Sequence, residues 1–383
     1  MHIIVVRVGT ITHPMTQSSI RMMLKLGHKV SVCTTKNQID LNDLFHQQVE
    51  IHEIDEDYTK PTGILGKFFR MFSIRKKLWK EIDALYADDT VLWVGHNITI
   101  KHLGDKLSRY RYILHLNELN ENIAYWPQFP FIRMNASKIG NSALAVIVPE
   151  YNRAHITKIF WNLKSVPFVM PNKPYLEKEF KKKPKISHSE QARELICRLE
   201  GKKIVLYQGV ISKERRLDTF VQAVKELGDQ YAFIIMGPKK KDIPFVLPDN
   251  CYLLDYIYAP YHLEITGHAD IGILSYIPEK TSNSPLNSIY CAPNKIFEYS
   301  MFGIPMISND VPAMKYLFDT EHCGEIADID SVDKIKSIIT NIDQRYDDYS
   351  ENAMNFYVKT DNLQLLSKVL KIVEEKMHKG DKQ

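Results

Sequence analysis

The sequence predicts an α/β protein built from two doubly wound halves. Short apolar strands alternate with amphipathic helices, which is the pattern of parallel βαβ units. The series begins twice, at His2 and again at Lys203, and a charged segment separates the two. A chain of 383 residues is also longer than one ordinary hydrophobic core, so we expect two domains.

The composition is ordinary for a globular protein, with 44% apolar residues, 25% charged residues and a net charge of +4. Five scattered cysteines without C-x-x-C spacing predict reduced thiols and argue against zinc or a disulfide framework. The N-terminal MHIIVVRVG predicts a strand rather than a signal peptide, and no apolar run approaches the ~20 residues of a membrane span. We therefore expect a cytoplasmic protein.

The first half is predicted to form a parallel sheet with its helices. Its first strand ends at Gly9, a βα turn where a glycine lets a ligand approach the backbone closely. No G-x-G-x-x-G follows, which argues against a dinucleotide-dependent dehydrogenase. The predicted strands are 2–8, 29–34, 49–54, 90–94, 111–114, 144–148 and 166–170, with helices over 18–26 and from about 150.

An Asp-x-Asp pair, Asp55 and Asp57, follows the third predicted strand. Such a pair can hold a divalent metal for a sugar nucleotide, but a solvated loop is the simpler interpretation. We therefore predict no metal site and no cofactor.

Residues 60–82, KPTGILGKFFRMFSIRKKLWKEI, alternate basic residues with aromatic and aliphatic ones. A basic helix with aromatics on its other face is typical of a segment that lies on an anionic membrane surface. A helix that packs its aromatics on the sheet and leaves a solvated basic rim explains the pattern equally well. Both interpretations stay open.

Polar residues follow the strand at 111–114, namely His115, Asn117 and Glu118. Open α/β sheets bind their ligands beyond the carboxyl ends of the strands. These residues are therefore candidates for ligand contact, with ordinary strand-end polar groups as the alternative.

Residues 173–202 are charged and poor in strand signals, which predicts a linker with a short helix at 191–199. We expect a first domain over 1–172, a second over 203–358 and a C-terminal helix within 359–383 that could pack back towards the first. Strands of the second half are predicted at 203–207, 231–236, 251–254 and 271–275, and helices at 217–227, 332–342 and 362–377.

The stretch 290–310, YCAPNKIFEYSMFGIPMISND, organises the second half. Pro293 suits a helix start, apolar residues then recur at helical spacing, and Gly303 ends the helix before a strand at 306–308. Asn294 and Lys295 at the helix start predict a phosphate contact, and Glu298, one turn further, could reach a sugar hydroxyl. Phosphate plus hydroxyl indicates a nucleotide.

Three segments of the second half resemble the retaining GT-B glycosyltransferases of family 4. YQGVISKERRLD at 207–218 is similar to the family's strand–glycine–loop–helix segment, and HADIGILSY at 268–276 to the strand before its donor loop. PNKIFEY at 293–299 is similar to the P-x-K-x-x-E-Y branch of the family.

The resemblance implies the GT-B fold, in which two Rossmann-like α/β domains face each other across a cleft. It implies that Arg215, six residues after Gly209, contacts the donor diphosphate and that Glu298 holds the ribose hydroxyls. The family commonly has a second glutamate, and Tyr290 stands at its place here. The contact made by that acid with the transferred sugar is therefore not assigned.

The resemblance in the first half is looser. The family ends a strand near the donor sugar with a His followed by Asp or Glu, and here Asn117-Glu118 occupies that place, with His115 two residues earlier. After the strand at 251–254, Tyr256 and Ile257 could frame the base by backbone contacts.

The chemistry agrees with these residues. Transfer from a nucleoside-diphosphate sugar requires the leaving diphosphate's charge to be neutralised, which Arg215 and Lys295 can do without a metal. We predict a metal-independent glycosyltransferase, with retention implied by the resemblance alone. Its donor is most simply a UDP sugar, and its acceptor a hydroxyl of a glycan or lipid-linked molecule in cell-surface polysaccharide or glycoconjugate synthesis.

Three alternatives bound this prediction. A non-catalytic sugar-nucleotide-binding subunit and a nucleotide-sugar epimerase on the same fold both remain open. Nucleic acid is not an expected partner, because the basic residues form one segment rather than a groove with stacking motifs. An anionic membrane surface at the inner face of the cell membrane, bound through 60–82, stays open as a partner.

Overall fold

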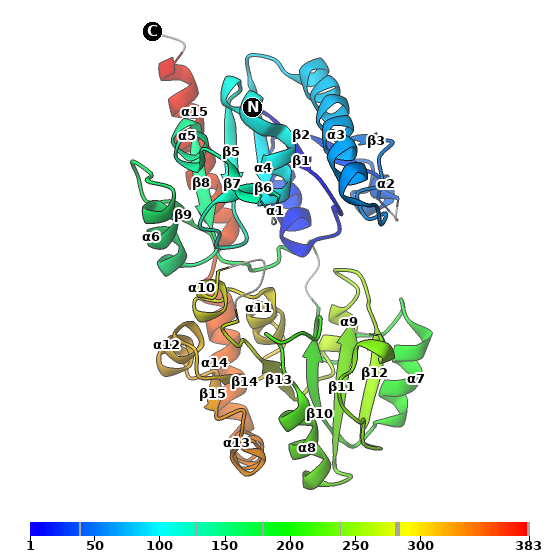
Figure 1. Cartoon of the computed structure of the whole chain (residues 1–383). Helices are drawn as coiled ribbons and strands as arrows, with labels where there is room; N and C mark the ends of the chain where they lie inside the picture. The colour runs from blue at the N-terminus through cyan, green and yellow to red at the C-terminus, as the bar shows by residue number, and fades with distance from the viewer. Residues whose placement is uncertain (38–39, 127–128, 178–179, 238, 280–283, 381–383) are drawn as a thin grey trace. The chain divides into compact units, whose positions relative to one another are not determined.

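The computed structural model describes residues 1–37, 40–126, 129–177, 180–237, 239–279 and 284–380, and it confirms the α/β class (Figure 1). The chain divides into two compact units. The first comprises Met1–Pro171, Tyr175–Glu177 and Asp361–Gln383, and the second Asn172–Pro174 and Lys178–Thr360. Each unit holds one parallel sheet with its own helices.

The sheet of the first unit has the order β3-β2-β1-β4-β5-β8-β9, and all of its strand pairs are parallel. The chain order therefore reverses between β1 and β4, which is the point where doubly wound sheets bind ligands. The strands are β1 (His2–Arg7), β2 (Lys29–Thr35), β3 (Glu50–Ile54), β4 (Thr90–Gly95), β5 (Tyr112–His115), β8 (Ala145–Val148) and β9 (Phe168–Val169).

Alternate residues of β1 enter the two cores that flank this sheet. Ile4 and Val6 join the cluster that contains α3, whereas Ile3 and Val5 join the cluster that contains the C-terminal helix α15. The helices of this unit are α1 (Pro14–Lys25), α2 (Leu41–Leu44), α3 (Ile64–Leu85), α4 (Asn97–Leu103), α5 (Ala136–Ser142), α6 (Tyr151–Phe160) and α15 (Asn362–Gly380), with the 3-10 helix η1 (Gly104–Arg109).

The sheet of the second unit has the order β12-β11-β10-β13-β14-β15, again with parallel pairs throughout. Its switch point lies between β10 and β13. The strands are β10 (Lys203–Gln208), β11 (Tyr231–Gly237), β12 (Cys251–Asp255), β13 (Ile271–Leu274), β14 (Met306–Asn309) and β15 (Gly324–Ala327).

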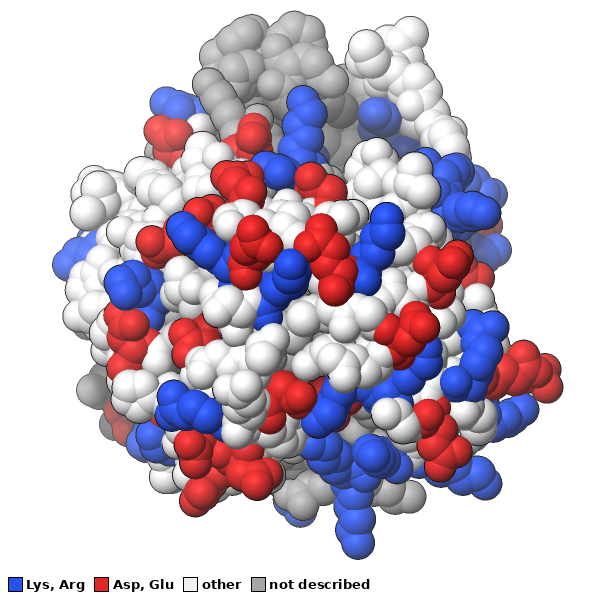
Figure 2. Space-filling model, turned by 90° about the horizontal axis from the view of Figure 1, so that it is seen from below, with Lys and Arg blue, Asp and Glu red and all other residues white. Residues whose placement is uncertain are grey.

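The helices of the second unit pair charges across their exposed faces, as Lys336 does with Glu226 at 2.9 Å. The face seen from below intersperses Lys and Arg with Asp and Glu (Figure 2). Mixed signs are typical of a solvated surface and do not favour a polyanion there. The helices are α7 (Glu190–Arg198), α8 (Asp218–Leu227), α9 (Leu263–Thr266), α10 (Leu286–Ile289), α11 (Asn294–Ser300), α12 (Pro312–Glu321), α13 (Val332–Gln344) and α14 (Tyr346–Lys359), with the 3-10 helix η2 (Lys240–Asp242).

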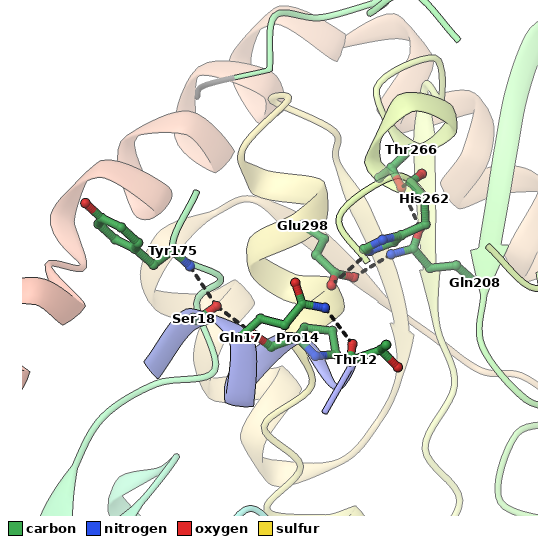
Figure 3. A network of polar contacts seen from close by, with 9 residues as sticks. All are labelled: Thr12, Pro14, Gln17, Ser18, Tyr175, Gln208, His262, Thr266 and Glu298. Atoms are coloured by element: carbon green, nitrogen blue, oxygen red, sulfur yellow. Dashed lines mark hydrogen bonds and ion pairs between the residues drawn. The ribbon is translucent and has the colours of Figure 1, made fainter. Parts of the chain in front are cut away.

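The segment between the two sheets is anchored to both units. In the first unit, the backbone N–H of Tyr175 donates to Ser18 Oγ at 2.9 Å, and that hydroxyl donates to Pro14 O at 2.8 Å (Figure 3). In the second, Lys173 Nζ donates to the carbonyls of Tyr357 and Thr360 at 2.6 and 2.7 Å. These residues fix the chain by hydrogen bonds where it leaves each unit.

The predicted strands and helices are found, with shifted ends. The first helix begins at Pro14 rather than Ser18, because a proline fits the first helical position. The sequence patterns did not predict, among others, the antiparallel hairpin of β6 (Ile123–Trp126) and β7 (Phe129–Met134), nor α4, α5, α12, β15 and α14. Residues 381–383 of the predicted C-terminal segment lie outside the described residues. No described helix is long and apolar enough to cross a membrane.

Candidate functional site

The candidate donor site lies at the carboxyl end of β10, beside the switch point of the second sheet. Gly209 follows β10 with φ +131, a backbone conformation that favours glycine. A Cβ at this position would lie 3.2 Å from Lys295 Nζ, so Gly209 and Lys295 are neighbours. Two predicted site residues that are 86 positions apart in the sequence (295 minus 209) thus meet here.

Glu298 is held by a hydrogen-bonded network at this edge. Its side chain comes from α11 and is buried, with the residue only 3% exposed. Gln208 Nε2 donates to its Oε2 at 2.5 Å, and His262 Nε2 lies 3.2 Å from its Oε1 (Figure 3). Thr266 Oγ1, in turn, lies 2.7 Å from Gln208 Oε1. The carboxylate is therefore fixed by residues from two other parts of the unit, the end of β10 and the start of α9, which is typical of a ligand-binding group rather than a solvated surface glutamate.

Lys295 and Arg215 form a positively charged pair beside two tyrosines. Arg215 Cζ lies 4.2 Å from the ring centroid of Tyr276, and Lys295 Nζ lies 5.6 Å from the same ring and 4.6 Å from that of Tyr207. Burial and the nearby Arg215 guanidinium lower the pKa of Lys295 to about 7. Two cations held close together suit a strongly anionic group such as a diphosphate.

The neighbouring Arg216 differs from Arg215. Its guanidinium is exposed and pairs with Asp218 at 3.3 Å and with Asp330 at 3.1 Å. Arg215 instead has a largely buried side chain that packs on Tyr276, donates to the Glu214 carbonyl at 2.9 Å and lies 3.7 Å from the Glu214 carboxylate. The structure thus separates two adjacent arginines into a surface ion pair and a site residue.

The other predicted residues of the second unit lie around this group. Asn294 is the first residue of α11, and Pro293 before it is the N-cap without a side-chain hydrogen bond. Tyr256 and Ile257 follow β12, and Tyr256 is 59% exposed with its ring edge-on to Tyr258 at 5.1 Å. Partial burial of its hydroxyl raises the pKa of Tyr256, and the nearby Tyr258 and Glu298 raise it further.

The first unit gathers the remaining predicted residues at the carboxyl ends of β1 and β5. Gly9 follows β1 with φ +98, and its N–H donates to Thr35 Oγ1 at 3.0 Å. His115 is the last residue of β5 and is buried, and its Nε2 has no hydrogen-bond partner among the described residues. Asn117 is buried, with its carbonyl accepting from Arg153 at 2.9 Å, whereas Glu118 beside it is partly exposed.

Sequence reasoning missed Gln208, His262 and, in the first unit, Arg7. Arg7 is the last residue of β1 and is only 7% exposed. The sequence could have identified Arg7, because a charged residue inside the apolar run HIIVVRV is unusual for a buried strand. His262 gave no such signal, since it lies in a turn 36 residues before Glu298 (298 minus 262).

The helix α3 has two different faces. Its C-terminal part is anchored in the core by Leu78 and by Trp79, whose Nε1 donates to the Leu103 carbonyl at 2.9 Å. Its first turns instead leave large apolar residues exposed, up to 75% for Leu65. These exposed residues, here called the α3 apolar face, are Ile64, Leu65, Phe68, Phe69 and Phe72.

The described residues contain no group of three or more His, Cys, Asp and Glu that could hold a metal ion. Asp57 instead accepts from the Thr59 hydroxyl at 2.6 Å and from its N–H at 2.9 Å. Chemically, the second unit offers one buried carboxylate and two cations at the edge of a Rossmann-like sheet. That set fits a ribose and a diphosphate.

Comparison with solved structures places the fold. No model of a known protein family matches the sequence, and no curated protein matches it. A glycosyltransferase from Rickettsia africae is similar over 98% of both chains, with a TM-score of 0.66 and 12% identity. Anabaena HepE in complex with UDP-glucose has a TM-score of 0.64 and 12% identity, over 98% of this chain and 100% of HepE.

A third similar structure is WaaG, a glycosyltransferase involved in lipopolysaccharide biosynthesis. It has a TM-score of 0.61 and 12% identity, over 97% of this chain and 99% of WaaG. This chain has the GT-B fold. The structural similarity confirms the fold of two Rossmann-like units that the sequence predicted. At 12% identity it does not establish the activity, which must be argued from the residues.

Proposed function

We propose that this GT-B protein is a glycosyltransferase that moves a sugar from a nucleoside-diphosphate donor to a hydroxyl of an acceptor. The observation that carries the proposal is the meeting of Glu298, Lys295 and Arg215 at the switch point of the second sheet. HepE, which has the same fold, binds UDP-glucose, and this supports UDP as the nucleotide. The proposed donor domain is 203–358 and the proposed acceptor domain 1–172.

In the proposed mechanism, Glu298 accepts hydrogen bonds from the ribose hydroxyls. Arg215 and Lys295 neutralise the charge that develops on the diphosphate as the bond between the anomeric carbon and the phosphate oxygen breaks. The acceptor oxygen forms the new bond to the anomeric carbon, and its proton passes to the departing diphosphate oxygen. No metal is invoked, because the two side-chain cations supply the charge, and retention rests on the resemblance to family 4 alone.

We assign the other predicted residues to supporting roles. Gly209 and Gly9 let the ligand approach the backbone, Asn294 contributes to phosphate binding, and Tyr256 and Ile257 frame the base. In the first unit, His115, Asn117 and Glu118 are assigned to the transferred sugar. The proposed acceptor is a glycan or a lipid-linked molecule in polysaccharide or glycoconjugate synthesis.

The decisive experiment is a thermal-shift screen of nucleotides and nucleotide sugars, followed by turnover with the ligand that binds. A ligand that binds only the native state raises the apparent stability by mass action. We expect UDP to raise Tm in the wild type and in Arg216→Ala, whose arginine pairs with surface aspartates. Glu298→Ala and Arg215→Ala should lose the shift.

The screen also separates the alternatives. Binding of UDP without any turnover by the isolated chain would indicate a non-catalytic subunit. A free epimerised sugar nucleotide, formed without an acceptor, would indicate an epimerase. Equal UDP shifts in the wild type and in both site variants would contradict the donor site itself.

We further propose that the α3 apolar face contacts an anionic membrane surface at which a lipid-linked acceptor lies. Exposed aromatics flanked by Lys67, Lys76 and Lys80, all exposed, match the apolar and anionic layers of such a surface. The other cations of this helix are engaged within the unit. Arg75 donates to the His102 carbonyl at 2.7 Å, and Lys77 pairs with Glu56 at 2.7 Å.

A further inference from the structure

The first unit contains a buried guanidinium, that of Arg7, for which the described residues supply no ion pair. Arg7 ends β1 at the switch point of the first sheet, and its Nε and Nη1 have no hydrogen-bond partner among the described residues. Its Nη1 lies 3.7 Å from where a Cβ of Gly95 would stand, so the side chain reaches the end of β4. Burial alone lowers the pKa of Arg7, to about 10, and no described carboxylate contributes to it.

Three histidines surround this guanidinium. Arg7 lies close enough to His13, His96 and His115 to lower the pKa of each, in addition to the larger effect of burial. The resulting pKa values are about 3 for His13 and about 4 for His96 and His115, so all three are neutral at ordinary pH. His13 Nδ1 and His115 Nε2 lack hydrogen-bond partners among the described residues.

The tautomer of His96 is fixed by its neighbour. Its Nδ1 accepts from the N–H of Ile98 at 3.2 Å, at the start of α4. A neutral ring that accepts at Nδ1 carries its proton on Nε2, which makes Nε2 a hydrogen-bond donor. The cluster therefore offers donors from Arg7 and His96 together.

Without a ligand, this cluster lowers the stability of the folded protein. A buried charge whose donors lack hydrogen-bond partners is strongly destabilising. Another buried arginine of this unit does have a hydrogen-bond partner. Arg153, which is also buried in this unit, donates to the Asn117 carbonyl at 2.9 Å.

We propose that Arg7 and His96 form the centre of an anion site that takes a phosphate or carboxylate group of the acceptor, an assignment that rests on the proposed transferase function. The planar guanidinium matches the paired oxygens of either group. His13 and His115 lie beside this site as neutral rings and do not compete with the anion for the arginine, and His115, assigned above to the transferred sugar, then stands between the two ligands. The acceptor is accordingly an acidic glycan or a phosphorylated molecule rather than a neutral sugar.

The test is a thermal-shift titration of the full chain with inorganic phosphate, at constant ionic strength and with saturating UDP. UDP occupies the proposed donor site, so that a remaining shift reports a second anion site. We expect phosphate to raise Tm under these conditions and Arg7→Met to abolish the shift. His96→Asn should weaken phosphate binding several-fold while the protein still folds, because asparagine tolerates the φ of +73 and can cap α4.

Arg153→Met is the matched control, since it also removes a buried arginine of the first unit. We expect it to lower Tm without ligand, because it leaves a paired carbonyl unsatisfied. Arg7→Met should leave the Tm of the unliganded protein equal or higher, because it removes an unpaired buried charge. A structural role for Arg7 would instead lower that Tm.

Several outcomes would overturn the proposal. They are an unchanged phosphate shift in Arg7→Met, no phosphate shift in the wild type, and a phosphate shift that UDP abolishes, which would assign the anion to the donor diphosphate. Titrations with glucose 6-phosphate, glucuronate and glucose then show whether the site prefers a phosphate, a carboxylate or a neutral sugar. A Tm shift with glucose alone would also contradict an anionic acceptor. If UDP gives no shift, the donor assignment fails separately, and the phosphate titration is read without UDP.

Discussion

The Gln208 amide donates a 2.5 Å hydrogen bond to the Glu298 carboxylate, joining the end of β10 to α11 within the second unit. Gln208 in turn accepts from the Thr266 hydroxyl, at 2.7 Å. Glu298 is thus oriented before any ligand arrives. A pre-oriented carboxylate loses less side-chain freedom when a ribose binds.

We therefore expect Gln208→Ala to weaken UDP binding through Glu298. A hydrogen bond to a charged group contributes about 1.5–3 kcal/mol, so the loss of orientation should raise Kd by about tenfold to a hundredfold. Glu298→Ala should raise Kd further, because it removes the contact itself. Isothermal titration with UDP measures both. Equal Kd values for the wild type and Gln208→Ala would show that the network does not serve the ligand.

Lys295 should take up a proton when a diphosphate binds. Its pKa of about 7 lies below the ordinary 10.5, because burial and Arg215 disfavour the charged form. A bound diphosphate favours that form and raises the pKa, so the complex holds more protons than the free protein near pH 8. UDP affinity should accordingly fall as pH rises above about 7, by up to tenfold per pH unit.

This proton uptake can be measured by titrating UDP calorimetrically in buffers of different ionisation enthalpy. Lys295→Met should bind UDP more weakly and without linked protons. The stability of the unliganded protein changes with pH in the opposite direction and rises as the pH is raised. The unfolded chain binds the lysine proton up to about pH 10.5, so this group's destabilising effect is complete below about pH 7 and is lost between pH 7 and 10.5. UDP binding without a buffer-dependent enthalpy would contradict the role of Lys295.

Gly209→Ala should impair both folding and ligand binding. The φ of +131 disfavours an L side chain, and the new Cβ would lie 3.2 Å from Lys295 Nζ. We expect a loss of about 1–3 kcal/mol in stability and weaker UDP binding, because Lys295 must move. Gly228→Ala is the matched control, since it has φ +82 but no atom within 4 Å of the new Cβ. It should lower Tm while leaving the Kd for UDP unchanged.

The α3 apolar face should support binding to anionic liposomes. Leu65→Ser combined with Phe69→Ser removes exposed apolar area, and replacing Lys67, Lys76 and Lys80 with Glu reverses the flanking charge. We expect either set to cut the bound fraction in a liposome sedimentation assay severalfold, and binding of the wild type to weaken with salt.

The control for this assay reverses the charge of three exposed lysines of the second unit, Lys225, Lys240 and Lys241. It gives the same change in net charge at a place without an exposed aromatic face. Comparable losses in the control and the α3 variants would show that binding follows net charge rather than α3. Unchanged binding in both α3 variants would rule out this surface.

Particular residues show how far sequence reasoning reached. The strand–helix order and the stop at Gly303, with φ +61, are local properties, and the structure confirms them. The proximity of Lys295 to Gly209 followed only from a resemblance. Two partners, Gln208 and His262, were missed because a hydrogen bond to Glu298 leaves no trace in the spacing of residues.

The segment 60–82 shows the same limit in another way. Its pattern fitted a packed helix and a membrane-binding helix equally well, and the structure divides α3 between a buried part around Leu78 and the exposed α3 apolar face. Periodicity reports that a helix has an apolar side. It does not report which of its turns have a sheet beneath them.

The sequence by itself determined the alternation of strands and helices, the duplication of the βαβ series and the helix that carries Lys295 and Glu298. These follow from side-chain periodicity, caps and turn residues, which act between neighbours in the chain. Only the tertiary structure decided the strand orders, the partners of Glu298 and the isolation of Arg7 from any described acid. Those depend on which distant segments pack together, because burial and charge pairing are properties of the folded chain.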